Sequence, residues 1–94
     1  MLRIEALEID DHILDKIEVR HGVPFDEVEE ACYSPHRHVR RGREGLYKVF
    51  SRTEAGRNLL VVLANQDNAV WKVVTAREMT ERERRLYRRI KGKE

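Results

Sequence analysis

The segment LYKVFSRTEAGRNLLVVLANQDNAVWKVVTA, residues 46–76, decides the fold. It contains three runs rich in branched and aromatic residues, at 46–52, 59–64 and 70–76, and such runs are typical of β-strands. Two polar stretches separate the runs, and the glycine in the first suits a tight turn. The middle run, LLVVLA, is apolar on both faces, which favours a central strand. The segment therefore predicts an antiparallel meander of three strands.

Helical patterns precede this meander. Asp10 or Asp11 can cap a helix over about residues 11–20, and Gly22 suits its end. Pro24 can open a second helix, because its missing N–H costs nothing in a first helical turn. Both helices carry apolar residues at helical spacing.

The remaining segments give weaker signals. Residues 2–8 have the slight alternation of a short edge strand, and residues 36–43 suit either an edge strand or a basic loop. The whole pattern predicts an α+β domain with two N-terminal helices, a small antiparallel sheet and a C-terminal helix. A chain of 94 residues is enough for one domain, residues 1–94.

The C-terminal helix has a defined start. The sequence Thr80-x-x-Glu83 is a capping box, in which each residue bonds a backbone N–H of the other. At about 100° per residue, Glu83 shares an arc with Tyr87 and Ile90 and faces the body of the protein. A carboxylate there needs a cation, and Arg77 is the nearest along the chain. The pair is either a local brace or part of an active site.

Charge is distributed unevenly along the chain. Residues 1–35 carry three basic and ten acidic residues, whereas residues 36–94 carry sixteen basic and seven acidic ones. Fourteen of the nineteen cations are arginine, which binds phosphate or carboxylate bidentately. The basic part indicates a polyanion or an acidic partner protein. Alternatively, the two halves neutralise each other in the fold.

Several function classes are disfavoured. The longest apolar run, residues 59–64, is too short for a bilayer, and the N-terminus lacks the apolar region of a signal peptide. Cys32 is the single cysteine, which excludes an internal disulfide, favours the reducing cytoplasm and suits a small buried residue. His36 and His38 lack the Cys or carboxylate partners of a zinc site. We expect two surface histidines, no metal, no cofactor and no membrane association.

Three segments resemble the BrnT family of toxins. They are RHGVPFDEVEEA (20–31), YKVFSRTEAGRNLLVVLA (47–64) and VWKVVTAREMTERERRLY (70–87), and the resemblance covers about residues 12–90. It implies a RelE-like fold of the RelE/ParE superfamily. It also implies a type II toxin, a metal-independent ribonuclease that inhibits translation and is neutralised by an antitoxin with a ribbon-helix-helix DNA-binding domain.

Metal-free RNA cleavage needs a base for the 2′-OH, an acid for the 5′-oxygen and cations for the phosphate. Arg57 and Arg77 lie at the ends of neighbouring predicted strands and are expected to converge on one phosphate. Histidine is a residue type that commonly serves as a general base or acid, so His21 is a candidate for either role, with Glu83 as another base. The structural alternatives are a solvated turn arginine for Arg57, a brace for Arg77 and Glu83, and a helix-end residue for His21.

Further cations and aromatic residues suit RNA binding. The candidate track comprises Arg37, Arg40, Arg41, Arg43, Lys48 and Arg52, with Tyr87 at the edge of the site and Trp71 or Tyr47 as a stacking face. Their alternative is a solvated basic surface. An acidic antitoxin that covered the same track would inhibit the enzyme.

The chain departs from the BrnT pattern at three places. Leu46 stands where the family usually has arginine, Ser51 where it often has glycine, and Ile9-Asp10 where it has Trp-Asp. The competing hypothesis is therefore a catalytically inactive RelE-like module that acts through a protein partner or RNA binding. A gyrase-directed toxin is a third and more remote alternative.

Overall fold

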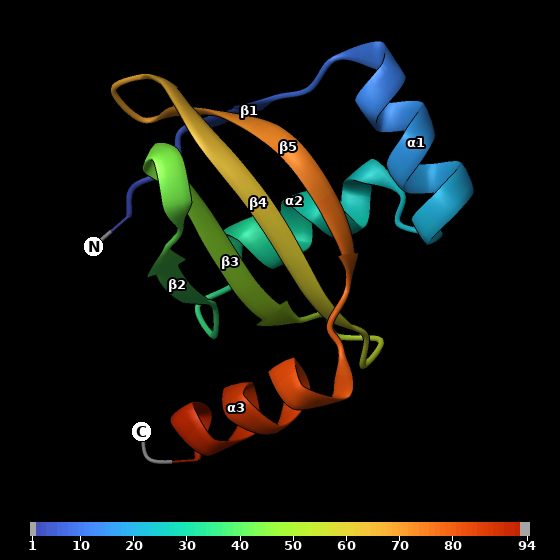
Figure 1. The fold of residues 1–94 in the computed structure, drawn as a ribbon, viewed down its shortest axis with the longest axis vertical. Coiled ribbons are helices and arrows are strands. Elements are labelled where there is room, and N and C mark those ends of the chain that lie inside the picture. The colour runs from blue at the N-terminus through green and yellow to red at the C-terminus, as the bar shows by residue number, and fades with distance from the viewer. Residues whose placement is uncertain (1, 93–94) are drawn as a thin grey trace.

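The computed structural model describes residues 2–92 of the chain (Figure 1). In order, its elements are β1 (Ala6–Glu8), α1 (Asp11–His21), α2 (Phe25–Tyr33), β2 (His38–Arg41), a short 3-10 turn (Arg43–Gly45), β3 (Leu46–Arg52), β4 (Asn58–Asp67), β5 (Val70–Glu78) and α3 (Glu81–Lys91). The α+β class is as predicted, and the short edge strand expected within residues 2–8 is β1.

The sheet has five strands in the order β1-β5-β4-β3-β2. The predicted meander of β3, β4 and β5 is confirmed, and β3 has the predicted bounds. The prediction of a wholly antiparallel sheet is wrong, because β1 pairs parallel with β5 and Leu7 lies opposite Trp71. The indole N–H of Trp71 donates to the Arg3 carbonyl over 2.9 Å. Such contacts between distant segments set the strand direction, and local alternation does not encode them.

The edge strand β2 settles the alternatives for residues 36–43. It pairs antiparallel with β3, with Arg40 opposite Lys48. The β4–β5 hairpin also continues further than predicted and turns at Asn68, where φ is +49°. Polar residues 65–67 favour a turn by composition, yet their backbone still pairs with β5 over most of this stretch.

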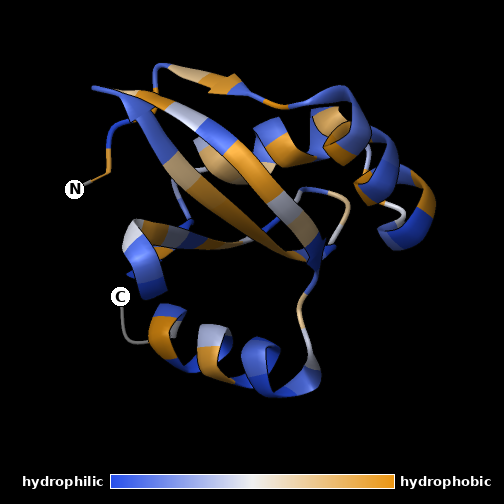
Figure 2. Ribbon diagram, turned by 45° about the horizontal axis from the view of Figure 1, so that its top comes forward, coloured by the Kyte–Doolittle hydropathy of each residue, from blue (hydrophilic) through white to orange (hydrophobic). Residues whose placement is uncertain are grey.

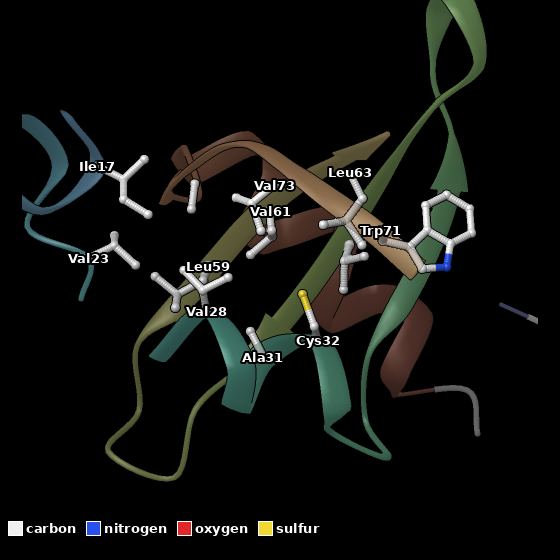
Figure 3. Packing of buried hydrophobic residues seen from close by; sticks show 12 residues of the cluster. Ile17, Val23, Val28, Ala31, Cys32, Leu59, Val61, Leu63, Trp71 and Val73 are labelled. Carbon is white, nitrogen blue, oxygen red and sulfur yellow. The ribbon is translucent and has the colours of Figure 1, made fainter. Parts of the chain in front are cut away.

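The main core lies between the sheet and helices α1 and α2 (Figure 3). Leu59, Val61 and Leu63 of β4 point into it and are fully buried, together with Ile17 of α1 and Cys32 of α2. A smaller cluster on the opposite face joins Phe50, Leu60, Met79 and Tyr87. Because both faces of β4 are covered, the prediction of a central strand from LLVVLA is confirmed.

Helix α3 lies across one end of the strands, apart from α1 and α2 (Figure 1). Its capping box is confirmed: Thr80 Oγ1 accepts from the Glu83 N–H, and Glu83 Oε1 accepts from the Thr80 N–H. Tyr87 is its only buried residue, and Figure 2 shows most of the helix as hydrophilic. Within residues 2–92, no helix has the length and apolar composition to cross a membrane.

Candidate functional site

Strand register decides which side of the sheet each candidate residue occupies. Arg77 lies opposite Leu60, which belongs to the cluster under α3. Glu78 lies opposite Leu59, which belongs to the core under α2. Directly paired residues project to the same face of a sheet. The side chain of Arg77 therefore emerges on the α3 face, and that of Glu78 on the α2 face.

Arg77 is braced by Glu83, as predicted. Its Nη1 and Nη2 atoms donate to the two carboxylate oxygens of Glu83 over 2.8 and 3.0 Å, and Nη1 also donates to the Glu78 carbonyl over 3.0 Å. A guanidinium has five N–H donors, so these bonds leave two without a partner among the described residues. The Arg77 side chain is 36% exposed. It is held in one orientation and can still donate to an anion.

Glu83 is poorly suited to be a general base. The hydrogen bonds from Arg77 hold its pKa below the usual value for glutamate, and the Thr80 backbone N–H contributes in the same direction. Three accepted hydrogen bonds stabilise the charged form of a carboxylate, so it takes up a proton less readily. Glu83 instead orients Arg77 and caps α3.

Arg57 lies on the other face. Its Nη1 donates to the Gly22 carbonyl over 2.8 Å and to Glu27, and its Nη2 donates to Glu78 over 2.9 Å. Arg57 and Arg77 therefore have different carboxylate partners, although both contact Glu78, and their predicted convergence on one phosphate stays a prediction. The two carboxylates around Arg57 come from α2 and β5, and the spacing of residues in the sequence does not predict their approach. Arg57 ties the connection between α1 and α2 to the ends of the strands.

His21 is the last residue of α1, next to this Arg57 brace. Gly22 follows it with φ at +65°, and the Gly22 N–H donates to the Glu18 carbonyl over 3.1 Å. Glycine adopts this left-handed conformation without steric cost, so the predicted helix end is confirmed. Because α1 packs on the α2 face through Ile17, His21 is separated from Arg77 by the sheet.

Two cations lie on the α3 face, at one end of a row of paired residues that crosses the strands. Arg40 lies opposite Lys48, Lys48 opposite Val62, and Val62 opposite Thr75. This row crosses four strands, and neighbouring strands lie about 4.8 Å apart. It runs next to the row of paired residues that ends at Arg77. Arg40 and Lys48 are both exposed.

Helix α3 carries further arginines. On one flank, Arg88 and Lys91 line a groove with α2 and the β3–β4 hairpin. Arg82, Arg85 and Arg89 surround a shallow hollow that contains Leu86, and at about 100° per residue they lie on the side of the helix opposite the buried Tyr87. These three arginines therefore face away from the sheet. We define the basic sheet face as Arg40, Lys48 and Arg77.

Several predicted RNA contacts lie away from the basic sheet face. The Arg41 guanidinium lies 5.7 Å from the centre of the Tyr47 ring, on the α2 side. Tyr47 packs edge-on against Trp71 at 5.1 Å between ring centres, and Trp71 is 5% exposed. These two aromatic residues belong to the core, so neither offers a stacking face there. Arg43 lies in the 3-10 turn.

The other candidates are held by backbone groups or lie beyond α3. Arg37 donates to the carbonyls of Cys32 and Leu2. The Tyr87 hydroxyl donates to the His36 carbonyl over 2.8 Å, and its ring is buried. Arg52 and Tyr87 both line the groove between α2, the hairpin and α3.

His38, for which the sequence predicts an ordinary surface residue, is a further candidate. It pairs with Phe50 in the row that ends at Arg77, and its ring centre lies 6.3 Å from that of Phe50. It therefore shares the α3 face with Arg40, two residues later. The period-2 alternation of a strand would have shown this relation, had residues 36–43 been predicted as a strand and not left open.

Neither thiol nor metal chemistry has a site among residues 2–92. Burial raises the pKa of Cys32 to about 12, so its thiol stays protonated at neutral pH and behaves as the predicted small core residue. The described part of the chain contains no cluster of His, Cys, Asp or Glu side chains that could hold a metal ion.

Comparisons with known proteins identify the fold. No protein-family model and no curated protein sequence matches the chain. Among solved structures, the crystal structure of the Brucella abortus ribonuclease toxin BrnT is similar, with a TM-score of 0.67. The match covers 81% of this chain and 97% of that one, at 12% sequence identity. The protein therefore has the fold of the BrnT ribonuclease toxin.

Proposed function

We propose that this protein is the toxin of a type II toxin–antitoxin system and a metal-independent ribonuclease that inhibits translation. Its BrnT-like fold supports the class. The observation that carries the proposal is Arg77, which is fixed by Glu83 yet keeps two N–H donors on the same face as two exposed cations. Such a group can stabilise developing charge on a phosphate without reorganising during the reaction.

The residues divide into roles by position. Arg40 and Lys48 hold backbone phosphates, and Arg77 donates to the phosphate under attack. Glu83 is a positioning residue that acts through Arg77. His38 is our candidate acid or base, because it lies on the same face as Arg77, three strands away in the same row of paired residues. Arg57 and His21 support the fold from the opposite face.

The proposed reaction is a transesterification within the RNA. The 2′-oxygen forms a bond to the adjacent phosphorus as a base removes its proton, and the bond from phosphorus to the 5′-oxygen breaks as an acid protonates that oxygen. The products are a 2′,3′-cyclic phosphate and a 5′-hydroxyl end. Extra negative charge forms on the phosphate oxygens in the transition state, where Arg77 would stabilise it.

RNA integrity after induced expression tests this function. We expect the wild-type protein to arrest growth while cellular RNA is degraded, and Arg77→Ala to relieve both effects. Arg20→Ala is the matched control, because Arg20 is exposed in the last turn of α1 on the other side of the molecule. Growth arrest with intact RNA, or full cleavage by Arg77→Ala, would contradict the proposal.

An inactive binding module is the competing function. Leu46 favours it, because the BrnT family usually has an arginine at this position. This alternative would be supported if the purified protein bound RNA in a salt-dependent manner and did not cut it. The incubation should last at least as long as expression takes to stop growth.

We also propose a cognate antitoxin with a ribbon-helix-helix domain. An acidic segment of such a partner would cover the basic sheet face and exclude RNA. Co-expression with the product of a short neighbouring reading frame is expected to restore growth. Charge reversal at Arg40 and Lys48 is expected to weaken the complex. If the complex is unchanged by both reversals, the partner binds elsewhere.

A further inference from the structure

A second polar site lies beside α3. It is an open groove of about 1340 Å³ between α2, the β3–β4 hairpin and α3. The groove is distinct from the basic sheet face, because Arg40, Lys48 and Arg77 do not line it.

The chemistry of the groove differs from one wall to the other. Arg52 and Arg88 are both exposed, and neither guanidinium has a hydrogen bond or ion pair within residues 2–92. On the α2 side, the Tyr33 ring is 47% exposed, a large aromatic surface left open to solvent. Glu30 lies on the same side, and one of its carboxylate oxygens accepts from the Glu54 backbone N–H over 2.6 Å.

These groups match the parts of a nucleotide. Arginine pairs bidentately with phosphate oxygens. An exposed tyrosine ring stacks on a nucleobase, and carboxylate and amide groups such as those of Glu30 and Asn58 can bond to base amino groups. An acidic peptide would satisfy the arginines, but it would meet the carboxylates of Glu30 and Glu54 and leave Tyr33 without a partner.

We infer that this groove binds one unpaired nucleotide of an RNA, with the base on Tyr33 and the phosphate between Arg52 and Arg88. This inference rests on the proposed function for the identity of the ligand as RNA. The bound nucleotide lies outside the reacting centre, since Arg77 is not among the residues that line the groove. The groove would hold the substrate at a point remote from cleavage.

Binding of an uncleavable RNA tests the inference directly. A fluorescein-labelled 2′-O-methyl oligoribonucleotide lacks the attacking hydroxyl, so its anisotropy reports binding alone. We expect Tyr33→Leu to weaken binding about tenfold, as stacked bases usually do when the ring is lost. Tyr33→Phe keeps the ring and is expected to bind like the wild type. Arg88→Gln is expected to weaken binding more than Arg20→Gln, which removes an equal charge elsewhere.

The possible outcomes separate the two proposals. Wild-type affinity in Tyr33→Leu, or equal losses in Arg88→Gln and Arg20→Gln, would overturn the groove site. If a polyglutamate peptide bound to the protein through Tyr33 while the oligonucleotide did not bind, the groove would be assigned to a protein partner. This result would also overturn the inference. A wild-type protein that binds the oligonucleotide through Tyr33 but cuts no RNA would refute the ribonuclease and leave the groove intact.

Discussion

At the scale of single residues, the arginines differ in how completely their donors are used. Arg57 is held by the Gly22 carbonyl and two carboxylates. Arg77 is held by one carboxylate and one carbonyl, and it retains two N–H donors. Hydrogen bonds to charged groups contribute more than those between neutral groups, so loss of either arginine has a structural cost. Of these two arginines, Arg77 is the one whose remaining N–H donors can bind an anion at the basic sheet face.

Replacement of Arg57 is expected to reduce stability. It is expected to change activity only by lowering the fraction of protein molecules that are folded. Arg57→Gln removes the charge that pairs with Glu27 and Glu78 and lowers the free energy of unfolding by about 2 kcal/mol. Urea denaturation measures the change, with Arg20→Gln as the control. Loss of RNA cleavage in Arg57→Gln that remains fully folded would show that Arg57 acts in the reaction.

Ser51 offers a second residue-scale prediction. Its hydroxyl is fully buried and has no hydrogen-bond partner within residues 2–92, a situation that costs stability. We expect Ser51→Ala to raise the free energy of unfolding by about 1 kcal/mol. Ser51→Gly is expected to be less stable than Ser51→Ala because glycine weakens a strand. Destabilisation by Ser51→Ala in urea denaturation would contradict this account.

At the scale of elements, α3 is anchored mainly at its first turn. The capping box and the pair of Arg77 and Glu83 fix its start, whereas Tyr87 is its single buried side chain. Loss of an N-cap typically costs about 1 kcal/mol. The position of Arg77 depends on this same turn, so the stability of α3 and the geometry of the candidate site are coupled.

The anchoring turn predicts a pH dependence. The folded pKa of Glu83 lies below its usual value of 4.5, chiefly because of the bonds from Arg77. Its contribution to stability is therefore complete above that value and is lost as pH falls from 4.5 toward the folded pKa. The stability difference between wild type and Glu83→Gln should be constant near neutral pH and should shrink in this acidic range. A difference independent of pH would show that the Glu83 carboxylate is not held charged by Arg77.

At the scale of the whole molecule, the fold keeps most of the opposite charges apart. Only two ion pairs within residues 2–92 join the acidic first 35 residues to the basic remainder: Glu27 with Arg57, and Asp10 with Lys72. Helices α1 and α2 pack against one face of the sheet, and strand register places the basic sheet face on the other. This separation of charges favours the binding of an anionic partner over mutual neutralisation of the two halves of the chain.

This separation of charges predicts how RNA binding depends on salt. For single-stranded RNA, the logarithm of affinity falls with the logarithm of salt concentration by about 0.7 for each phosphate contact. Arg40→Gln and Lys48→Gln should each reduce this slope by about 0.7, whereas Arg20→Gln should leave it unchanged. Anisotropy titrations of a labelled 2′-O-methyl oligonucleotide over a salt series measure the slopes. Equal slopes for all three variants would place the RNA away from the basic sheet face.

The sequence by itself determined the elements whose signals are local. The meander follows from the apolar runs at 46–52, 59–64 and 70–76. The start of α3 follows from Thr80 and Glu83, because capping and helical periodicity act within a few residues. The pairing of Arg77 with Glu83 could be predicted for the same reason, since a strand end and a helix start are joined by a short connection.

Only the tertiary structure decided which functional residues lie together. Register places Arg77 on the α3 face, whereas Glu27 of α2 accepts a hydrogen bond from Arg57, which is 30 residues away in the sequence. The direction of β1, and the presence of His38 on the same face as Arg40 and Arg77, also depend on pairing between distant segments. A shift of register by one residue exchanges the two faces of a strand, so local residue patterns alone do not determine the composition of a site built across strands.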